Sequence, residues 1–172
     1  MIGALEMQRF YIQMNLFSVK KRYEILDERQ NVAYTCRSEW FSTKKTLHVM
    51  DRQDRELMTI QRRAGAHASR YEVQLPEGLF ISVVRERSYL HPEYRVEGLD
   101  WNISGDYFHY EYRIDDGENE IGNISKARAN RKNQYQAEIC ETENALPVLA
   151  VVLAIDSSIV EARMIAGSIT PV

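Results

Sequence analysis

Cysteine is scarce in this chain of 172 residues, which has only Cys36 and Cys140. Two cysteines exclude a secreted scaffold framed by several disulfides, and they exclude a zinc site built from four thiolates. The longest apolar run, 145–155, has eleven residues, whereas a helix needs about 20 to cross a bilayer. The first 17 residues also lack the continuous apolar core of a signal peptide. We therefore expect a cytoplasmic protein without a transmembrane segment.

Motifs of the common enzyme classes are missing as well. The sequence has no Gly-x-Ser-x-Gly elbow, phosphate-binding loop, dinucleotide fingerprint or His-Glu-x-x-His helix. The two cysteines fall within strand patterns, which favours inert thiols over nucleophiles. The acidic segment 115–120 lacks the alternating ligands of a calcium loop, and its Asp116-Gly117 pair predicts a hairpin turn. No ligand spacing is seen among His48, His67, His91 and His109. We expect neither catalytic residues nor a metal or cofactor.

The overall composition is that of one soluble globular domain. Apolar residues make up 44% of the chain and charged residues 27%, which is ordinary for a folded protein and wrong for a disordered one. The length suits a single domain, which we place at 1–172. The net charge of −3 argues against a generally basic, nucleic-acid-binding protein.

A short strand signature recurs about every 23 residues. Each copy begins with a large apolar residue and alternates with polar ones, which is the pattern of a half-buried strand. The lead residues are Tyr23, Leu47, Tyr71, Tyr94, Tyr112 and Tyr135. A second strand candidate precedes each copy, at 9–16, 32–40, 57–61, 79–85, 101–105 and 120–125. Twelve strands are expected to close on themselves, because closure removes exposed sheet edges.

The segment after the last strand has the features of a buried helix. Glu143 and Asn144 provide a cap-like start, and Pro147 falls in the first turn, where proline is tolerated. The following residues are apolar on every face, so such a helix must be enclosed. A further buried strand is the alternative, since Val and Ile favour strands. The interior of a twelve-stranded barrel is too wide for its own side chains to fill, which favours the helix.

These patterns predict a mainly β fold. We expect a closed twelve-stranded antiparallel β-barrel, with strands over about 8–141, around a buried hydrophobic C-terminal α-helix over about 145–166.

Several motifs, taken in order, resemble the LURP-one-related family. That family is grouped with the tubby C-terminal domain and the phospholipid scramblases. The matching motifs are Phe17-Ser18, Tyr23-Glu24-Ile25, Asp27, Trp40-Phe41-Ser42, Leu47, Asp51, Trp101, Gly105-Asp106, Ile121-Gly122-Asn123-Ile124-Ser125-Lys126 and Ala154-Ile155-Asp156. The resemblance covers about 8–160 and implies a twelve-stranded barrel around a buried C-terminal helix, called tubby C-terminal-like.

The resemblance implies a lipid connection but no defined activity. Tubby domains bind phosphoinositides and scramblases act on phospholipids, whereas most LURP-one-related proteins have no established biochemical function. The calcium-binding segment and the membrane-proximal cysteine cluster of the scramblases are not recognisable in this sequence. Neither calcium-driven scrambling nor a lipid anchor is therefore implied.

The charges separate by position if successive strands reverse direction. The connections inside each pair of strands then lie at one end of the barrel, the basic end, with a summed charge of +12. Those between pairs lie at the other, the acidic end, with a summed charge of −11. The loop Tyr107-Phe108-His109-Tyr110 adds aromatic rings to the basic end.

A basic end suits an anionic membrane surface, where each Lys or Arg contributes about 1 kcal/mol and aromatic rings favour the headgroup layer. We expect a non-enzymatic module that binds phosphoinositide or other anionic phospholipid. Its candidate headgroup ligands are Lys20, Lys21, Arg22, Lys44, Lys45, Arg62, Arg63, Lys126, Arg128, Arg131 and Lys132.

Other interpretations of the charged ends stay open. The basic loops are also explained as solvated surface that keeps the connections soluble. The two ends would equally let copies or partners stack in a protein–protein interaction scaffold. Nucleic-acid-associated regulation and scramblase-type lipid handling are further alternatives, and the first has no supporting recognition motif.

Overall fold

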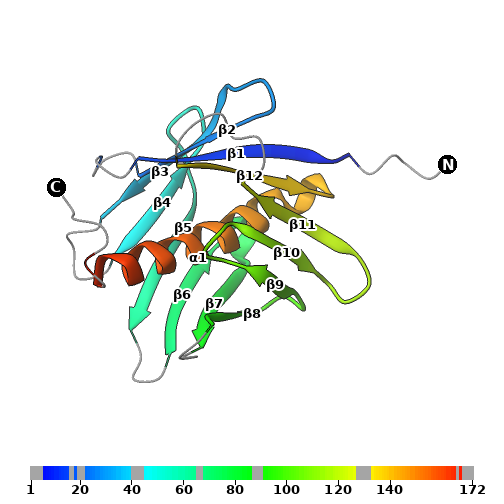
Figure 1. Cartoon of the computed structure of the whole chain (residues 1–172). Helices are drawn as coiled ribbons and strands as arrows, with labels where there is room; N and C mark the ends of the chain where they lie inside the picture. Colours follow the sequence, from blue (N-terminus) through cyan, green and yellow to red (C-terminus); the bar gives the residue numbers. More distant parts are fainter. Residues whose placement is uncertain are drawn as a thin grey trace.

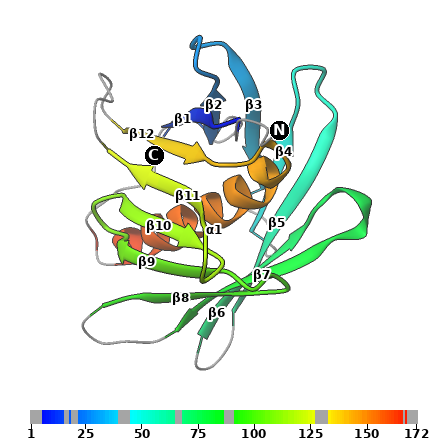
Figure 2. The same cartoon turned by 90° about the vertical axis from the view of Figure 1, so that its right-hand side faces the viewer.

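Twelve antiparallel strands form one continuous sheet in a computed structural model, which describes residues 6–15, 18, 22–39, 45–64, 68–86, 91–126, 133–165 and 167. The strands are β1 (Gln8–Met14), β2 (Tyr23–Leu26), β3 (Val32–Ser38), β4 (Thr46–Met50), β5 (Glu56–Ala64), β6 (Ala68–Gln74), β7 (Phe80–Glu86), β8 (Glu93–Glu97), β9 (Asn102–Asp106), β10 (Glu111–Asp115), β11 (Glu120–Ser125) and β12 (Gln134–Ile139). Every predicted strand is present. Neighbours in sequence pair along the sheet, and β1 pairs with β12, so that the sheet curls around a central space (Figures 1 and 2).

The barrel is nearly closed rather than closed, which corrects the expectation from the sequence. The sheet order begins at β8 and ends at β9, and no backbone ladder joins these two strands in the described part of the chain. Both strands are short, and most side chains of β9 are exposed. Side chains bridge the seam at one point, where the rings of Tyr94 and Tyr107 meet edge to face with centroids 4.9 Å apart. Packing therefore replaces the missing hydrogen bonds there.

The helix α1 (Ala145–Ile165) runs through the inside of the barrel (Figure 2). It follows the short 3-10 turn η2 (Thr142–Asn144), which contains the cap-like residues Glu143 and Asn144, and a second turn, η1 (Pro76–Gly78), joins β6 to β7. All eight side chains from Val148 to Ile155 are fully buried. By length and composition Thr142–Arg163 would be long and apolar enough to cross a membrane, but 83% of its most apolar window is buried in this protein. The prediction of a buried helix is confirmed.

Two glycines of the motifs quoted above are required by close packing. A Cβ atom on Gly122 in β11 would lie 3.2 Å from Cγ1 of Val148, so glycine lets the helix approach this strand. Gly105 in β9 has φ of +137°, and a Cβ there would lie 2.4 Å from the carbonyl oxygen of Glu111. Only glycine adopts that conformation without strain.

Successive strands alternate in direction, so the last residues of β1, β3, β5, β7, β9 and β11 lie at one end of the barrel and those of the other six strands at the opposite end. The helix starts at the second of these ends, the acidic end, directly after β12, and its last turns lie at the basic end (Figure 1). The described candidate ligands Arg22, Lys45, Arg62, Arg63 and Lys126 therefore lie at the same end as the polar part of the helix.

Candidate functional site at the basic end

The polar part of the helix is surrounded by buried tyrosines. The hydroxyl of Tyr110 donates to Oδ1 of Asp156 at 2.7 Å, and the hydroxyls of Tyr94 and Ser158 are 2.9 Å apart. Tyr110 also stacks on Tyr135, with ring centroids 4.4 Å apart. Five of the six predicted lead residues are tyrosines, and all six are buried. The hydroxyls of Tyr110 and Tyr94 thus partner Asp156 and Ser158, which suits these polar residues to the interior of the barrel. The hydroxyl of Ser157 donates to the carbonyl oxygen of Leu153 within the helix, at 2.7 Å.

Burial raises the pKa of Asp156, while nearby Tyr110, Tyr23 and Arg22 favour its charged form and limit that rise. Arg22 is itself buried, with 7% of its surface exposed. This predicted headgroup ligand therefore lies inside the mouth of the barrel, close to a carboxyl group of the helix.

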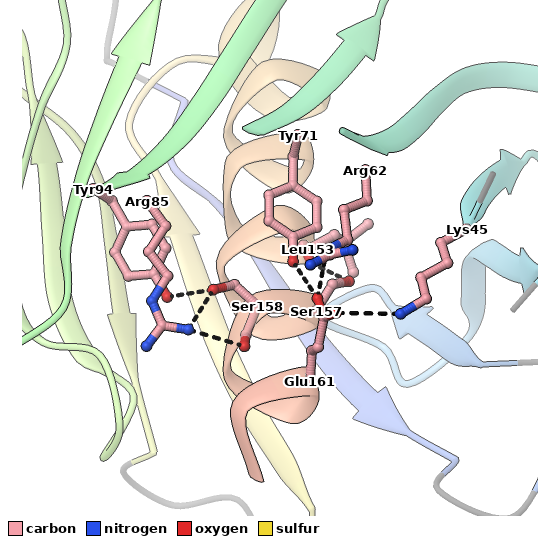
Figure 3. Close-up of polar contacts among 9 residues, drawn as sticks. All are labelled: Lys45, Arg62, Tyr71, Arg85, Tyr94, Leu153, Ser157, Ser158 and Glu161. Carbon is pink, nitrogen blue, oxygen red and sulfur yellow. Dashed lines mark hydrogen bonds and ion pairs between the residues drawn. The ribbon is translucent and has the colours of Figure 1, made fainter. Parts of the chain in front are cut away.

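The carboxylate of Glu161 forms ion pairs with two further predicted headgroup ligands, Arg62 and Lys45 (Figure 3). Its Oε2 atom lies 2.7 Å from Nε of Arg62, and its Oε1 atom lies 3.2 Å from Nζ of Lys45. The hydroxyl of Tyr71 donates to Oε2 at 3.2 Å. Only 12% of the Glu161 side chain is exposed. These cations are thus held by the helix and are already largely neutralised.

Two other basic side chains, Arg85 and Arg63, also donate hydrogen bonds within the protein. Arg85 donates to the carbonyl oxygen and the hydroxyl of Ser158, at 3.4 Å and 3.2 Å (Figure 3). The predicted ligand Arg63 donates to Glu72 on the neighbouring strand at 2.9 Å. Of the predicted ligands that the structure describes, Lys126 differs, because its side chain is exposed and has no ion-pair partner among the described residues.

Lys126 lines a pocket of about 260 Å³ beside the end of the helix. Arg163 and His109 also line it, and Arg163 donates to the carbonyl oxygen of Phe108 at 3.2 Å. Gln134 and Tyr135 also line it, and each has one buried polar atom, Nε2 and the hydroxyl, without a hydrogen-bond partner within the described part of the chain. The remaining lining residues are Met14, Phe108, Tyr110, Asn133 and Val160. The lining therefore combines two basic side chains with two residues that each hold an unused hydrogen-bonding group.

The other candidate ligands lie outside the described residues. They are Lys20, Lys21, Lys44, Arg128, Arg131 and Lys132. The last three belong to the segment 127–132, which joins Lys126 to Asn133.

Comparison with known proteins agrees with the resemblance seen in the sequence. The profile of the LURP-one-related family matches residues 8–156. The chain belongs to the LURP-one-related family. An uncharacterized protein of Bacillus subtilis (strain 168), YxjI, is 24% identical over 150 residues, which cover 87% of this chain and 93% of that protein. An X-ray structure of an Arabidopsis thaliana protein matches with a TM-score of 0.62 at 15% identity, covering 90% of this chain and 93% of the other. The second likeness concerns the fold alone.

Sequence reasoning missed the residues that complete the site in this LURP-one-related protein. Gln134 lies in a strand and gave no signal. Asp156, Glu161 and Arg163 had one, because they are charged residues in a helix whose first half is wholly apolar. A buried acid in such a helix calls for partners on the surrounding wall.

The cysteines and histidines of this family member form no reactive cluster in the described part of the chain. No group of three or more His, Cys, Asp or Glu side chains there is placed to hold a metal ion. Cys36 is buried and Cys140 half-buried, and both are free thiols. Burial raises the pKa of both thiols, which disfavours the nucleophilic thiolate.

Proposed function

We propose that the pocket at the basic end binds the phosphate of an anionic phospholipid headgroup and holds the protein at a membrane surface. The observation that carries the proposal is that Lys126 and Arg163 line one pocket together with Gln134 and Tyr135, two residues that each have an unpartnered polar atom. A phosphate oxygen accepts hydrogen bonds from ammonium, guanidinium, amide and hydroxyl groups alike. This set of donors therefore matches a phosphate better than it matches a neutral ligand.

The basic end works in two layers in this proposal. An inner layer, made of Arg22, Lys45, Arg62 and Arg85, faces Asp156, Ser158 and Glu161 and fixes the end of the helix. An outer layer, made of Lys126 and Arg163, lines the pocket and contributes positive charge toward a ligand, and Arg163 also favours the charged form of Asp156. Two cations near an anionic leaflet contribute about 2 kcal/mol together, or about a 30-fold gain in binding.

An aromatic side chain beside the pocket supports contact with a bilayer. Phe108 is 38% exposed in the turn between β9 and β10, and it also lines the pocket. A ring in this position would enter the headgroup layer while the pocket holds a phosphate. The protein acts in this proposal as a non-enzymatic binding module related to the tubby-like domains, without a cofactor.

Vesicle flotation tests the proposal. The whole chain is mixed with three kinds of phosphatidylcholine vesicle. The first contains no anionic lipid, the second contains phosphatidylserine, and the third contains phosphatidylinositol bisphosphate. We expect binding only to the anionic vesicles, weakening as salt rises, because exposed charges are screened. Lys126→Glu reverses one charge and should reduce binding about thirtyfold, whereas Arg163→Gln removes one charge and should reduce it about fivefold. Equal binding to neutral and anionic vesicles, or no binding to any of them, would contradict the proposal.

A matched control separates the pocket from general charge. Arg29→Glu makes the same change in charge as Lys126→Glu but lies at the acidic end, in the exposed turn between β2 and β3. It should leave binding unchanged. Soluble inositol phosphate should compete with the vesicles if the headgroup phosphate is what is recognised. Binding of soluble phosphate without any binding to vesicles would assign the pocket to a free metabolite instead.

A further inference from the structure

Exposed apolar side chains gather at the acidic end of the barrel. Among the described residues, the large apolar side chains that remain exposed are Met7, Val32, Leu79, Phe80 and Phe108. All but Phe108 lie at or just before the first residue of β1, β3 or β7, and these strands start at the acidic end. Phe80 is 54% exposed and Met7 is 56% exposed. Of these residues, Leu79 and Phe80 are adjacent in sequence, and exposed apolar side chains that lie together mark an interaction surface more often than scattered single residues do.

A groove of about 390 Å³ lies within this end, over the start of the helix. Its apolar lining comes from four parts of the chain, namely β1, β3, the β6–β7 connection and the first helical residues. The apolar residues are Phe10, Tyr34, Leu75, Pro76, Leu79, Ala145, Leu146 and Pro147. A cavity of this size admits a few apolar side chains of a ligand or a partner.

Two carboxylates border the groove. Glu77 and Glu143 are exposed, they line the groove, and neither has an ion-pair partner within the described ranges of the chain. Neighbouring acids of the same end are engaged differently. Asp27 pairs with Arg52 at 2.9 Å, and Asp51 pairs with Arg55 at 2.7 Å. Part of the negative charge that remains available at this end is therefore beside the apolar groove.

The backbone holds one of these carboxylates in an unusual conformation. Glu77 has φ of +61°, a region that residues other than glycine rarely adopt. Its loop is closed by hydrogen bonds from the amide of Leu75 to the carbonyl of Leu79, at 2.8 Å, and from the amide of Leu79 to the carbonyl of Pro76, at 3.3 Å. The loop thereby presents Glu77 and Leu79 together at the groove. Strain of this kind is often retained where it positions functional side chains.

We propose that this groove docks a short amphipathic segment of a partner protein, with apolar side chains in the groove and Lys or Arg side chains paired with Glu77 and Glu143. A basic segment is the expected ligand because its positive charge is complementary to the negative charge of Glu77 and Glu143. An anionic membrane would be repelled by the same carboxylates, and an uncharged lipid chain would make no use of them. The inference concerns the opposite end from the pocket of Lys126 and does not depend on the headgroup proposal.

Selection from a library of random short peptides displayed on phage tests this without a prior choice of sequence. The immobilised whole chain should enrich peptides that combine large apolar residues with Lys or Arg. Synthetic copies should bind the whole chain in solution about tenfold more weakly after Leu79→Ser, which removes apolar contact. The double variant Glu77→Gln/Glu143→Gln should weaken binding about fivefold at low salt and less at high salt.

Controls at the same end distinguish the groove from its surroundings. Val32→Ser and Glu118→Gln change an exposed apolar residue and an exposed acid outside the groove, and they should leave peptide binding unchanged. Amide shifts on titration with a selected peptide should centre on 75–79 and 142–147. The proposal fails if no peptides are enriched, if enriched peptides lack basic residues, or if binding survives Leu79→Ser and both glutamine changes. Self-association of the chain that the same variants abolish would assign the groove to a second copy instead.

Discussion

Replacing Glu161 tests whether the inner basic residues serve the helix. Glu161→Gln keeps the size of the side chain and an oxygen that can accept from Tyr71, but it removes the charge that faces Arg62 and Lys45. The variant is expected to unfold more easily, because two cations at the mouth of the barrel lose their counter-charge.

The expected loss of folding stability follows from the exposure of each cation and from its distance to the carboxylate of Glu161. Arg62 is 22% exposed and lies 2.7 Å from the carboxylate, so its pair contributes more than a typical surface pair. Lys45 is 34% exposed and 3.2 Å away, so solvent screens it more. Because both ion pairs are lost, we expect Glu161→Gln to lower the free energy of unfolding by about 1–2 kcal/mol. Glu161→Leu should cost about 1–3 kcal/mol more, because the buried hydroxyl of Tyr71 loses its acceptor.

Urea denaturation followed by circular dichroism measures both costs. Glu118→Gln is the matched control, since Glu118 is an exposed acid in the turn between β10 and β11, and it should change stability by less than about 0.5 kcal/mol. A double-mutant cycle with Arg62→Gln should show coupling, because the two residues are in contact. The reasoning is refuted if Glu161→Gln is as stable as Glu118→Gln, or if the cycle is additive.

Three other changes probe the interior. Leu149→Asp buries an unpaired charge at a fully buried position and should prevent folding, whereas Leu149→Met should remain folded by circular dichroism. Gly122→Ala should cost about 1 kcal/mol in urea denaturation by crowding Val148, and the cost should shrink in a Val148→Ala background. The pKa of Asp156 is raised above its ordinary 3.8 in the folded protein, so the unfolded chain loses this proton first as pH rises. Stability relative to Asp156→Asn should therefore decrease with pH from about 3.8 up to the folded pKa and stay level above it; a relative gain over that interval would contradict the burial argument.

Local patterns were sufficient to predict the strands and the helix. Alternation around the lead residues, such as Tyr71 and Tyr135, depends on neighbours two positions apart, and it placed all twelve strands. The apolar run after Pro147 was too long and too uniformly apolar for a surface element, which predicted the buried helix.

The seam and the ion pairs could not be predicted, because they depend on residues far apart in sequence. Whether β8 pairs with β9 is decided by the curvature of the whole sheet and not by either strand alone. Lys45 and Glu161 are separated by 116 positions, so in the sequence Lys45 resembles any exposed basic residue of a loop. The charge count therefore gave no information about which of the described cations are neutralised by the helix.

Vesicle binding by Lys126→Gln compared with Arg63→Gln tests the central claim most directly. Both variants remove one positive charge from the basic end, but Lys126 lines the pocket and Arg63 pairs with Glu72. The account predicts that Lys126→Gln weakens binding to vesicles containing phosphatidylinositol bisphosphate by about fivefold, and that Arg63→Gln binds like the unmodified protein. Equal losses in the two variants would show that total charge governs adhesion, and they would contradict a headgroup site in the pocket.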